Sequence, residues 1–359
     1  MDAALALARR GLGNTWPNPA VGCVIVKDGI VVGRGWTQAG GRPHAETQAL
    51  ARAGSAAKGA TVYVTLEPCS HHGKTPPCAE ALIAAQVARV VVATGDPDNR
   101  VDGRGIAMLR EAGIAVEQGI CKAEADALNA GFFKRVRAGK PLVTLKLAGS
   151  LDMRIATKTG ESKWITGDAS RARAHLIRAQ HDAIMVGSGT VLADDPSLDV
   201  RLPGFDNSRK VRIVVDGRLR TPLTAKLVRT AKSQPSWIVH RPDADKFRVA
   251  AFAESGVEML ALEPGREGHA TPDALLKALA AKGITRLMIE GGAQLAGAFL
   301  RADAVDRLAI FRAGRVIGGD GVPAIAAFGV AELANAPGFR LETLEKIGDD
   351  TLETWTRDH

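Results

Sequence analysis

Cysteine and aromatic residues are scarce in this 359-residue chain, and their scarcity argues against two classes of protein, disulfide-rich proteins and nucleic-acid-binding proteins. Four cysteines in a chain of this length do not build a disulfide framework, which favours a reducing compartment. Aromatic residues make up only 4% of the sequence, and the lysines and arginines form no block. A nucleic-acid-binding surface normally combines clustered basic residues with interleaved aromatics, so we expect no nucleic-acid partner.

Long apolar runs are also missing. No segment reaches the roughly 18 apolar residues that a membrane-spanning helix needs, so we expect no membrane partner. Residues 1–10 carry an acidic residue, Asp2, where a secretory signal would be basic, and they predict an amphipathic helix. We therefore expect a cytoplasmic protein.

The net charge of +8 is shared by both halves of the chain. It indicates either a solvated basic surface or an electrostatic field that attracts phosphorylated small molecules.

The length and the pattern of elements predict two α/β domains, at residues 1–140 and 141–359. A polar helix over 123–137 is followed by Lys140-Pro141 and by a new apolar strand from Leu142. Strand and helix patterns alternate in both halves, which favours mostly parallel sheets covered on both faces. The predicted strands are 21–26, 30–33, 61–66, 89–93, 115–117, 142–146, 183–186, 211–215, 236–240, 258–260, 286–289 and 307–311. Residues 206–210 and 263–271 are predicted to be surface loops.

The most informative motif is His44-Ala45-Glu46 followed by Cys69 and Cys78. One histidine and two cysteines are three zinc ligands, and a three-ligand zinc site keeps a fourth position for water. Glu46 is the proton carrier that a hydrolytic deaminase needs, because the zinc nucleobase deaminases combine H-x-E with a P-C-x-x-C motif. This spacing places His44 and Cys78 at the beginnings of two helices, where backbone N–H groups favour a thiolate.

The long insert between the two cysteines makes the motif more specific. The segment 68–78, Pro-Cys-Ser-His-His-Gly-Lys-Thr-Pro-Pro-Cys, resembles the zinc loop of the bifunctional deaminase/reductase family of riboflavin biosynthesis. Residues 17–26, Asp96-Pro97 and residues 103–105 resemble the same family. The resemblance implies a cytidine-deaminase-like α/β/α domain at the N-terminus, with a bound Zn²⁺.

Other residues near the motif have two readings each. Asn18 in its proline-flanked loop either holds the substrate or belongs to a plain turn, and Lys74 either binds the substrate or is a solvated lysine. His71 and His72 either contact the substrate or pack the loop, and either one as a fourth ligand would make the zinc site structural. Cys23 is expected in the core, and Cys121 has no assigned role.

The second half gives weaker signals by itself. Gly291-Gly292 follows a strand and opens a helix, an arrangement suited to a diphosphate. Gly187-Ser188-Gly189-Thr190 also follows a strand, but its continuation predicts a turn and not a helix.

Resemblance to a known family is what indicates a function for this half. Residues 146–152, 160–166, 176–180, 189–196 and 290–292 resemble the reductase half of the same family, which implies a dihydrofolate-reductase-like domain that uses NADPH. By position, the implied cofactor contacts are Ala148, Trp164, Thr190, Asp194, Gly292, Ala293, Gln294, Leu295, Ala296, Gly297 and Ala298. The implied substrate contacts are Ser162, Arg178, Leu198, Arg201 and Glu290, and the two arginines are suited to grip a phosphate.

Three details qualify the resemblance. Met153 stands where the family has glycine, and we predict an ordinary β conformation for it, because left-handed backbone would strain a methionine. Residues 313–318 depart from the family's Ala-Pro pattern. Asp216 at a strand end would suggest NADH in a Rossmann fold, whereas Arg218 and Arg220 suit a 2′-phosphate, and we predict NADPH.

The sequence thus predicts deamination of a phosphorylated diaminopyrimidinone riboside, followed by NADPH-dependent reduction of its ribose. The resemblance also implies a homo-oligomer. Two rivals remain at this point: a deaminase of bases in RNA, and a zinc-stabilised protein that only binds phosphates.

Overall fold

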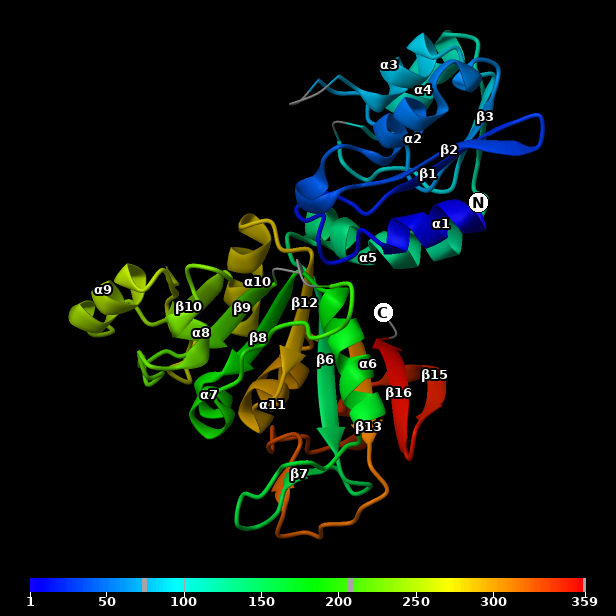
Figure 1. Cartoon of the computed structure of the whole chain (residues 1–359). Helices are drawn as coiled ribbons and strands as arrows, with labels where there is room; N and C mark the ends of the chain where they lie inside the picture. Colours follow the sequence, from blue (N-terminus) through cyan, green and yellow to red (C-terminus); the bar gives the residue numbers. More distant parts are fainter. Residues whose placement is uncertain (73–75, 100, 206–209, 358–359) are drawn as a thin grey trace. The chain divides into compact units, whose positions relative to one another are not determined.

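The computed structural model describes residues 1–72, 76–99, 101–205 and 210–357, and it divides into two compact units (Figure 1). The first unit comprises Met1–Lys140 and the second Pro141–His359. No helix among the described residues is both long enough and apolar enough to cross a membrane.

The first unit is a five-stranded sheet with helices on both faces. In Figure 1, α2, α3 and α4 cover one face, and α1 and α5 lie on the other. The strand order is β2-β1-β3-β4-β5. The strands are β1 (Gly22–Lys27), β2 (Ile30–Trp36), β3 (Thr61–Val64), β4 (Arg89–Val92) and β5 (Ala115–Gln118). The helices are α1 (Asp2–Arg9), α2 (Ala45–Ala53), α3 (Cys78–Ala84), α4 (Arg104–Glu111) and α5 (Lys122–Ala138), with short 3₁₀ turns at Ala39–Gly41 and Gly54–Ala57.

The hairpin at the start of this sheet follows from its turn residues. Asp28 and Gly29 both have positive φ, 49° and 77°, which is the conformation of a two-residue hairpin turn. Lys27 pairs with Ile30 across it. The β-branched and apolar residues of β3 and β4 make these central strands, and their side chains pack with Ala49, Leu82 and Leu109 of the covering helices.

The expectation of a mostly parallel sheet is wrong for the first unit. β1 runs antiparallel to both β2 and β3, whereas β3, β4 and β5 are parallel. The hairpin itself was predicted, and it forces one antiparallel pairing. The second arises because β3 joins the edge of β1 and not that of β2. Cys23, fully buried on β1, is a core residue as predicted.

The second unit is built on a nine-stranded sheet of order β11-β10-β9-β8-β12-β6-β13-β16-β15. Its first seven strands in this order are parallel, as predicted, and β16 and β15 are antiparallel additions. The strands of this sheet are β6 (Leu142–Gly149), β8 (Ala183–Gly187), β9 (Val211–Val215), β10 (Ser236–His240), β11 (Glu258–Ala261), β12 (Arg286–Glu290), β13 (Arg307–Arg312), β15 (Phe339–Ile347) and β16 (Asp350–Arg357). A separate two-stranded sheet pairs β7 (Arg154–Ala156) with β14 (Val322–Pro323). The helices are α6 (Asp168–Ala179), α7 (Ser188–Asp194), α8 (Lys226–Arg229), α9 (Lys246–Glu254), α10 (Pro272–Ala281) and α11 (Ala293–Arg301), with a 3₁₀ turn at Leu333–Asn335.

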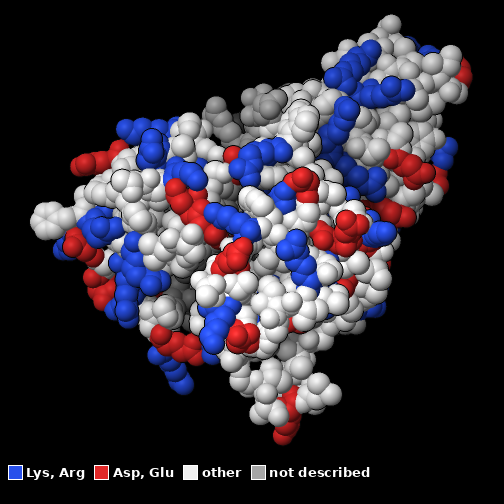
Figure 2. Space-filling view, turned by 60° about the horizontal axis from the view of Figure 1, so that its bottom comes forward, with Lys and Arg blue, Asp and Glu red and all other residues white. Residues whose placement is uncertain are grey.

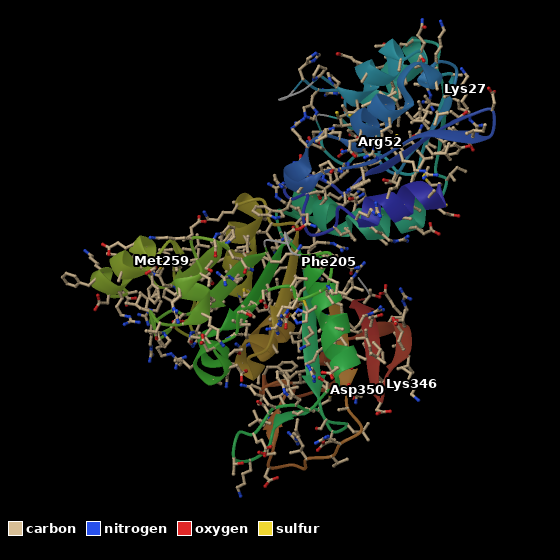
Figure 3. All side chains as sticks on the ribbon, viewed as in Figure 1. Lys27, Arg52, Phe205, Met259, Lys346 and Asp350 are labelled. Atoms are coloured by element: carbon tan, nitrogen blue, oxygen red, sulfur yellow. The ribbon has the colours of Figure 1, made fainter. Side chains whose placement is uncertain are left out.

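The C-terminal hairpin of β15 and β16 was not predicted. The side chains of β15 are mostly exposed and those of β16 mostly half-buried, and polar residues interrupt the apolar ones in both strands. The hairpin therefore lacks the apolar runs that mark the central strands. Asp350, labelled in Figure 3 beside the beginning of α6, ties this hairpin to that helix. Its Oδ2 accepts bonds from Gly167 N at 2.8 Å and from Ser170 Oγ at 2.6 Å, and so satisfies the beginning of α6.

Two local predictions in this unit are also wrong. Residues Ser188–Asp194 form a helix, α7, where a turn was expected, because Gly187 begins it without a capping side chain that the sequence would show. Lys210, expected in a surface loop, is fully buried and donates to Ala179 O at 2.7 Å. The rest of that predicted loop, 206–209, lies outside the described residues.

Met153 has a φ of 55°, which overturns the predicted β conformation. The turn is held by bonds from Met153 N to Ser150 O at 2.9 Å and from Ala324 N to Met153 O at 3.1 Å. These bonds fix the left-handed backbone whatever side chain stands there. The methionine is therefore strained by about 1–2 kcal/mol.

Replacing Met153 tests this strain. Met153→Gly and Met153→Ala remove the same contacts beyond Cβ, but only glycine relieves the left-handed backbone. We expect the glycine variant to have the larger free energy of unfolding, by about 1 kcal/mol, as measured by urea denaturation. An alanine variant equal to or more stable than the glycine variant would contradict the assignment.

Candidate active sites

Three side chains of the first unit meet at one point. His44 Nδ1 lies 3.3 Å from Cys78 Sγ and 3.6 Å from Cys69 Sγ, and the three ligand atoms lie within 4.8 Å of one another. Among the described residues, no other group of three or more histidine, cysteine and acidic side chains converges in this way. One nitrogen and two sulfurs form a donor set that suits zinc, so the residues fit the metal.

Two helix beginnings deliver these ligands. His44 is the residue before the first turn of α2, and Cys78 is the first residue of α3. Cys78 N donates to Cys69 Sγ at 3.2 Å. Hydrogen bonds from the Cys78 thiol and from His44 lower the pKa of Cys69 to about 4, even though burial opposes this shift. The fold therefore prepares a thiolate ligand at Cys69.

Glu46 lies on the first turn of α2, two residues after His44, with only 3% of its surface exposed. Burial, and next the negative charge of Cys69, raise the pKa of its carboxyl to about 7. A carboxyl with a pKa near neutrality is suited to both accept and donate a proton at physiological pH. The geometry therefore places an acid/base group beside the three ligands.

The loop that carries Asn18 packs against the segment leading to His44. A Cβ added to Gly41 would lie 1.9 Å from Asn18 Nδ2, so the Asn18 side chain lies directly on the Gly41 backbone. The loop is fixed from behind by Asn129 of α5. Its side-chain amide accepts a bond from Ala20 N at 3.0 Å and donates one to Ala20 O at 3.1 Å. Asn129 was not identified from the sequence, where it is one polar residue in a polar helix.

Asn129 is expected to matter for substrate binding without touching the substrate. Asn129→Ala leaves a buried N–H and a buried C=O of Ala20 unpaired, at a cost of about 1–3 kcal/mol for each unpaired group. We expect a lower free energy of unfolding and a raised KM for deamination, with zinc content unchanged. Steady-state ammonia release and metal analysis would measure these effects. Glu124→Ala, at an exposed position of the same helix, serves as the control, and an unchanged KM in Asn129→Ala would contradict this role.

The remaining predictions for this loop have mixed outcomes. Lys74 lies outside the described residues. His72 is exposed and lies 3.5 Å from Glu80 on α3, whereas His71 is half-buried with no hydrogen-bond partner for its Nδ1 among the described residues. Neither histidine belongs to the three-ligand cluster. Cys121 lies elsewhere, at the beginning of α5, and donates to Asp2 Oδ1 at 3.6 Å.

The second unit holds a buried charged cluster at the end of β12, beside the middle of β6. Glu290 and Lys146 are register partners on these parallel strands, and Lys146 Nζ lies 3.9 Å from Glu290 Oε2. Arg178 of α6 forms a two-pronged ion pair with Glu290, with 2.8 Å between Nη2 and Oε2. Although burial alone would raise it, Arg178 and then Lys146 hold the pKa of Glu290 at about 2. Glu290 is therefore an ionised, acceptor-only group at neutral pH.

Lys146 is a functional candidate that the sequence reasoning missed. Its signal was a lysine inside the apolar strand β6, where a buried cation is rare. Burial lowers the pKa of its ammonium, and Phe311 lies beneath it with 5.9 Å between Nζ and the ring centroid.

The two predicted phosphate arginines differ in the structure. Arg178 donates to Glu290 from Nε and Nη2, and to Asp199 O from Nη1 at 3.0 Å. Its guanidinium therefore orients Glu290 and is not available as a whole to a phosphate. Arg201 is 65% exposed in its side chain and packs on His175, with 3.3 Å between Arg201 N and His175 Nδ1. Although Arg201 Nε also lies 3.7 Å from Asp199 Oδ1, its exposure makes it the more accessible of the two arginines to a phosphate.

The other predicted substrate contacts are less well placed. Leu198 is 3% exposed and its side chain packs in the hydrophobic core, which leaves only its backbone for a ligand. Ser162 is half-buried in the segment between β7 and α6.

The predicted cofactor residues cluster around the beginning of α11. Gly291 and Gly292 have φ of 82° and 85°, and a Cβ on either would lie 3.5–3.6 Å from Thr190 Oγ1 of α7. The beginnings of two helices thus meet across a turn without side chains, a cradle that fits the diphosphate of a dinucleotide. Along α11, Gln294 is exposed, Leu295 and Ala298 are half-buried, and Ala296 and Gly297 are buried.

The predicted cofactor residues outside α11 are exposed or half-buried. Trp164 is 64% exposed, with Arg171 stacked 4.6 Å from its ring centroid. Asp194 is exposed at the end of α7, and Ala148 is half-buried on β6.

Asp216 does not offer a carboxylate to a cofactor ribose. It is 1% exposed, and its Oδ2 accepts bonds of 2.7 Å from both Thr221 N and Thr221 Oγ1. Arg218 and Arg220 are exposed in the same turn, and Arg220 Nη2 donates to Ser188 Oγ at 2.8 Å. The arrangement favours a phosphorylated over an unphosphorylated ribose.

Comparison with protein families gives two matches. Residues 1–94 match the cytidine and deoxycytidylate deaminase zinc-binding region, and residues 141–352 match the RibD C-terminal domain. The riboflavin biosynthesis protein RibD of Escherichia coli is 44% identical, over 98% of this chain and 96% of that protein. RibD of Aquifex aeolicus is 41% identical over the same shares.

Solved structures agree along the whole chain. Acinetobacter baumannii RibD superposes with a TM-score of 0.89 at 40% identity, covering 100% of this chain and 98% of that one. A Thermotoga maritima protein described as a diaminohydroxyphosphoribosylaminopyrimidine deaminase/5-amino-6-(5-phosphoribosylamino)uracil reductase superposes with a TM-score of 0.87 at 32% identity, covering 100% and 97%.

These likenesses define the class of protein, a two-domain enzyme that joins a zinc-dependent deaminase to an NADPH-dependent reductase. The chain belongs to the RibD family of bifunctional riboflavin biosynthesis proteins. The predicted fold, a cytidine-deaminase-like domain followed by a reductase domain, is confirmed.

Proposed function

We propose that residues 1–140 deaminate 2,5-diamino-6-(ribosylamino)-4(3H)-pyrimidinone 5′-phosphate and that residues 141–359 reduce its product to 5-amino-6-(5-phosphoribitylamino)uracil. The observation that carries the proposal is the pairing of two sites in one chain. One is the His44, Cys69 and Cys78 cluster with Glu46, and the other is the buried Glu290 cluster beside a diphosphate cradle. The printed name of the Thermotoga maritima relative supports the choice of substrate.

In the deaminase site, His44, Cys69 and Cys78 would hold Zn²⁺, which supplies a water activated for attack at neutral pH. Glu46 takes one proton from that water and gives it to the ring nitrogen, and it then moves the remaining hydroxyl proton to the departing amine, which leaves as ammonia as the ring carbonyl forms. Its raised pKa suits this exchange, because both protonation states are accessible near pH 7. Asn18 and Lys74 are proposed to hold the substrate.

In the reductase site, bound NADPH would supply the hydride that reduces the C1′ carbon of the opened ribose. The ionised Glu290 accepts hydrogen bonds from the ribose hydroxyls and so orients the opened chain. Arg178 and Lys146 fix its position and its charge. Arg201 binds the phosphate, with Ser162 and the backbone of Leu198 alongside. Ala148, Trp164, Thr190, Asp194 and the first turn of α11 contact the cofactor.

The setting of the enzyme is also a proposal. A cytoplasmic location is supported by the zinc ligands, because Cys69 and Cys78 must stay reduced, and all four cysteines are free thiols. The likeness to the family supports a homo-oligomer, which light scattering of the purified protein would measure. In Figure 2 basic and acidic side chains are interspersed over the visible face of the larger unit, as for a small-molecule enzyme.

One assay tests both activities. The zinc-loaded protein is mixed anaerobically with the diaminopyrimidinone ribosyl phosphate, and ammonia release and NADPH oxidation are recorded together. We expect ammonia without NADPH and, once NADPH is added, one equivalent oxidised for each ammonia released. Ammonia with no NADPH oxidation would exclude the proposed reductase. Neither signal from zinc-loaded protein would exclude the proposed substrate.

The choice of cofactor has its own test. We expect NADPH to support faster reduction than NADH at matched low concentrations, because Asp216 is buried in its own turn and Arg218 and Arg220 are exposed. Equal rates would contradict the preference for NADPH.

A further inference from the structure

Cys69 lies between the beginnings of two helices. On one side, α3 holds it directly, through Cys78 N to Cys69 Sγ at 3.2 Å and Ala79 N to Cys69 O at 3.2 Å. On the other side stands α4, which supplies none of the three ligands. A link from α4 to Cys69 therefore has to pass through the two residues before the cysteine, Glu67 and Pro68.

Glu67 provides this link. Its carboxylate is buried, with 4% of the residue exposed, and it occupies the beginning of α4. Oε1 accepts bonds from Gly105 N at 3.0 Å and Ile106 N at 3.3 Å. Oε2 accepts a bond from Gly103 N at 3.1 Å and a longer one from Asp96 N at 3.5 Å. A buried carboxylate is stable here because these N–H groups and the positive end of the helix offset its charge.

The backbone next to Glu67 also approaches α4 closely. A Cβ added to Gly105 would lie 2.0 Å from Pro68 O, so only glycine permits this contact. Gly103, with a φ of 81°, turns the chain into the helix and aims its N–H at Glu67. These two glycines explain physically why residues 103–105 carry the Gly-Arg-Gly pattern.

We propose that Glu67 is a positioning residue for the zinc site, which anchors the Cys69 segment to α4 and fixes the direction of its sulfur. Cys69 is then held from both sides, by α3 through its own atoms and by α4 through Glu67. This inference rests on the proposed deaminase function. It adds a role for α4, and for a carboxylate that is neither a ligand nor a proton carrier.

The test is zinc affinity in the full-length protein. In Glu67→Gln, one oxygen becomes an NH₂ group that faces backbone N–H donors, so half of the anchor is lost while the shape stays. We expect the Kd for zinc, from competition with a chelator, to rise roughly 10- to 100-fold, as for other groups that support metal ligands. The absorption bands of the Co²⁺-substituted protein should shift as well, because they report the geometry around the sulfurs. Reduction of the already deaminated pyrimidine should remain within about twofold.

Glu111→Gln is the matched control, because Glu111 is an exposed glutamate at the other end of the same helix. It should change neither the Kd nor the cobalt spectrum. Gly105→Ala is a second route to the same displacement, through Pro68, and it decides the question if Glu67→Gln does not fold. Wild-type zinc affinity and an unchanged cobalt spectrum in Glu67→Gln, or in Gly105→Ala where that variant must decide, would overturn the inference. A wild-type protein that binds no zinc would instead overturn the proposed function itself.

Discussion

Glu46→Gln is expected to abolish deamination while leaving zinc bound. Loss of the general acid/base lowers kcat by about 10²–10⁴-fold, because glutamine can neither take the proton from water nor deliver it to the amine. The His44, Cys69 and Cys78 side chains are unchanged, so the metal content should stay at one zinc for each chain. Ammonia release and metal analysis on the same preparation measure the two results.

The control for Glu46→Gln is Glu80→Gln, on α3. Glu80 is half-exposed and contacts the exposed His72, so its loss should leave kcat within about twofold. The reductase activity of Glu46→Gln should equal that of the wild type when the deaminated pyrimidine is supplied. Ammonia release by Glu46→Gln at more than a tenth of the wild-type rate would show that another group carries the proton.

The deaminase site could be predicted from the sequence because its chemistry lies in three short segments. His44 and Glu46 are two residues apart, and Cys69 and Cys78 flank one loop, so the helix beginnings that join them could be inferred locally. Asn129 and Glu67 could not be recognised as parts of this site. Asn129 reaches Ala20 from 109 residues away, and Glu67 reaches a helix that begins at Arg104. Contacts of this kind follow from the order of strands in the sheet, which no local pattern reveals.

The candidate reductase site could not be predicted from local motifs. The residues proposed for it were chosen by resemblance, which did not indicate how they contact one another. Arg178 and Glu290 were assigned separately to the substrate, and the structure joins them in one ion pair because β12 and α6 come together. Met153 shows a further limit. A backbone conformation set by bonds to Ser150 and Ala324 overrides the preference of the residue that occupies it.

The largest stability effect is expected from Arg178→Gln. Removing one partner of a buried ion pair leaves an uncompensated charge and costs about 3–5 kcal/mol. Here Lys146, at 3.9 Å from Glu290, offsets part of that charge, so the lower end of the range applies. Reduction should fall at least about 10²-fold, because Glu290 loses its orientation. Deamination should be unchanged. Hydrogen exchange in peptides from β6 and β12 reports the stability of this unit by itself.

Arg173→Gln on the same helix is the matched control. Arg173 also forms a two-pronged pair, with Glu345 at 2.8 Å, but both side chains are more than a third exposed. Solvent screens such pairs, so its loss should cost no more than about 1 kcal/mol. If the two variants lose equal stability, burial is not what makes the Arg178 pair strong.

The pH dependence of this effect has a definite sign. Glu290 has a pKa of about 2 in the folded protein, below the value of about 4.3 for an unperturbed glutamate. The stability that it contributes is therefore complete above about pH 4.3 and is lost as the pH falls towards 2. In Arg178→Gln the carboxyl regains a higher pKa, so the difference in unfolding free energy between wild type and variant should be full at pH 7 and shrink below about pH 4. A difference that grows in acid would mean that Arg178 stabilises the unit by packing and not through the charge of Glu290.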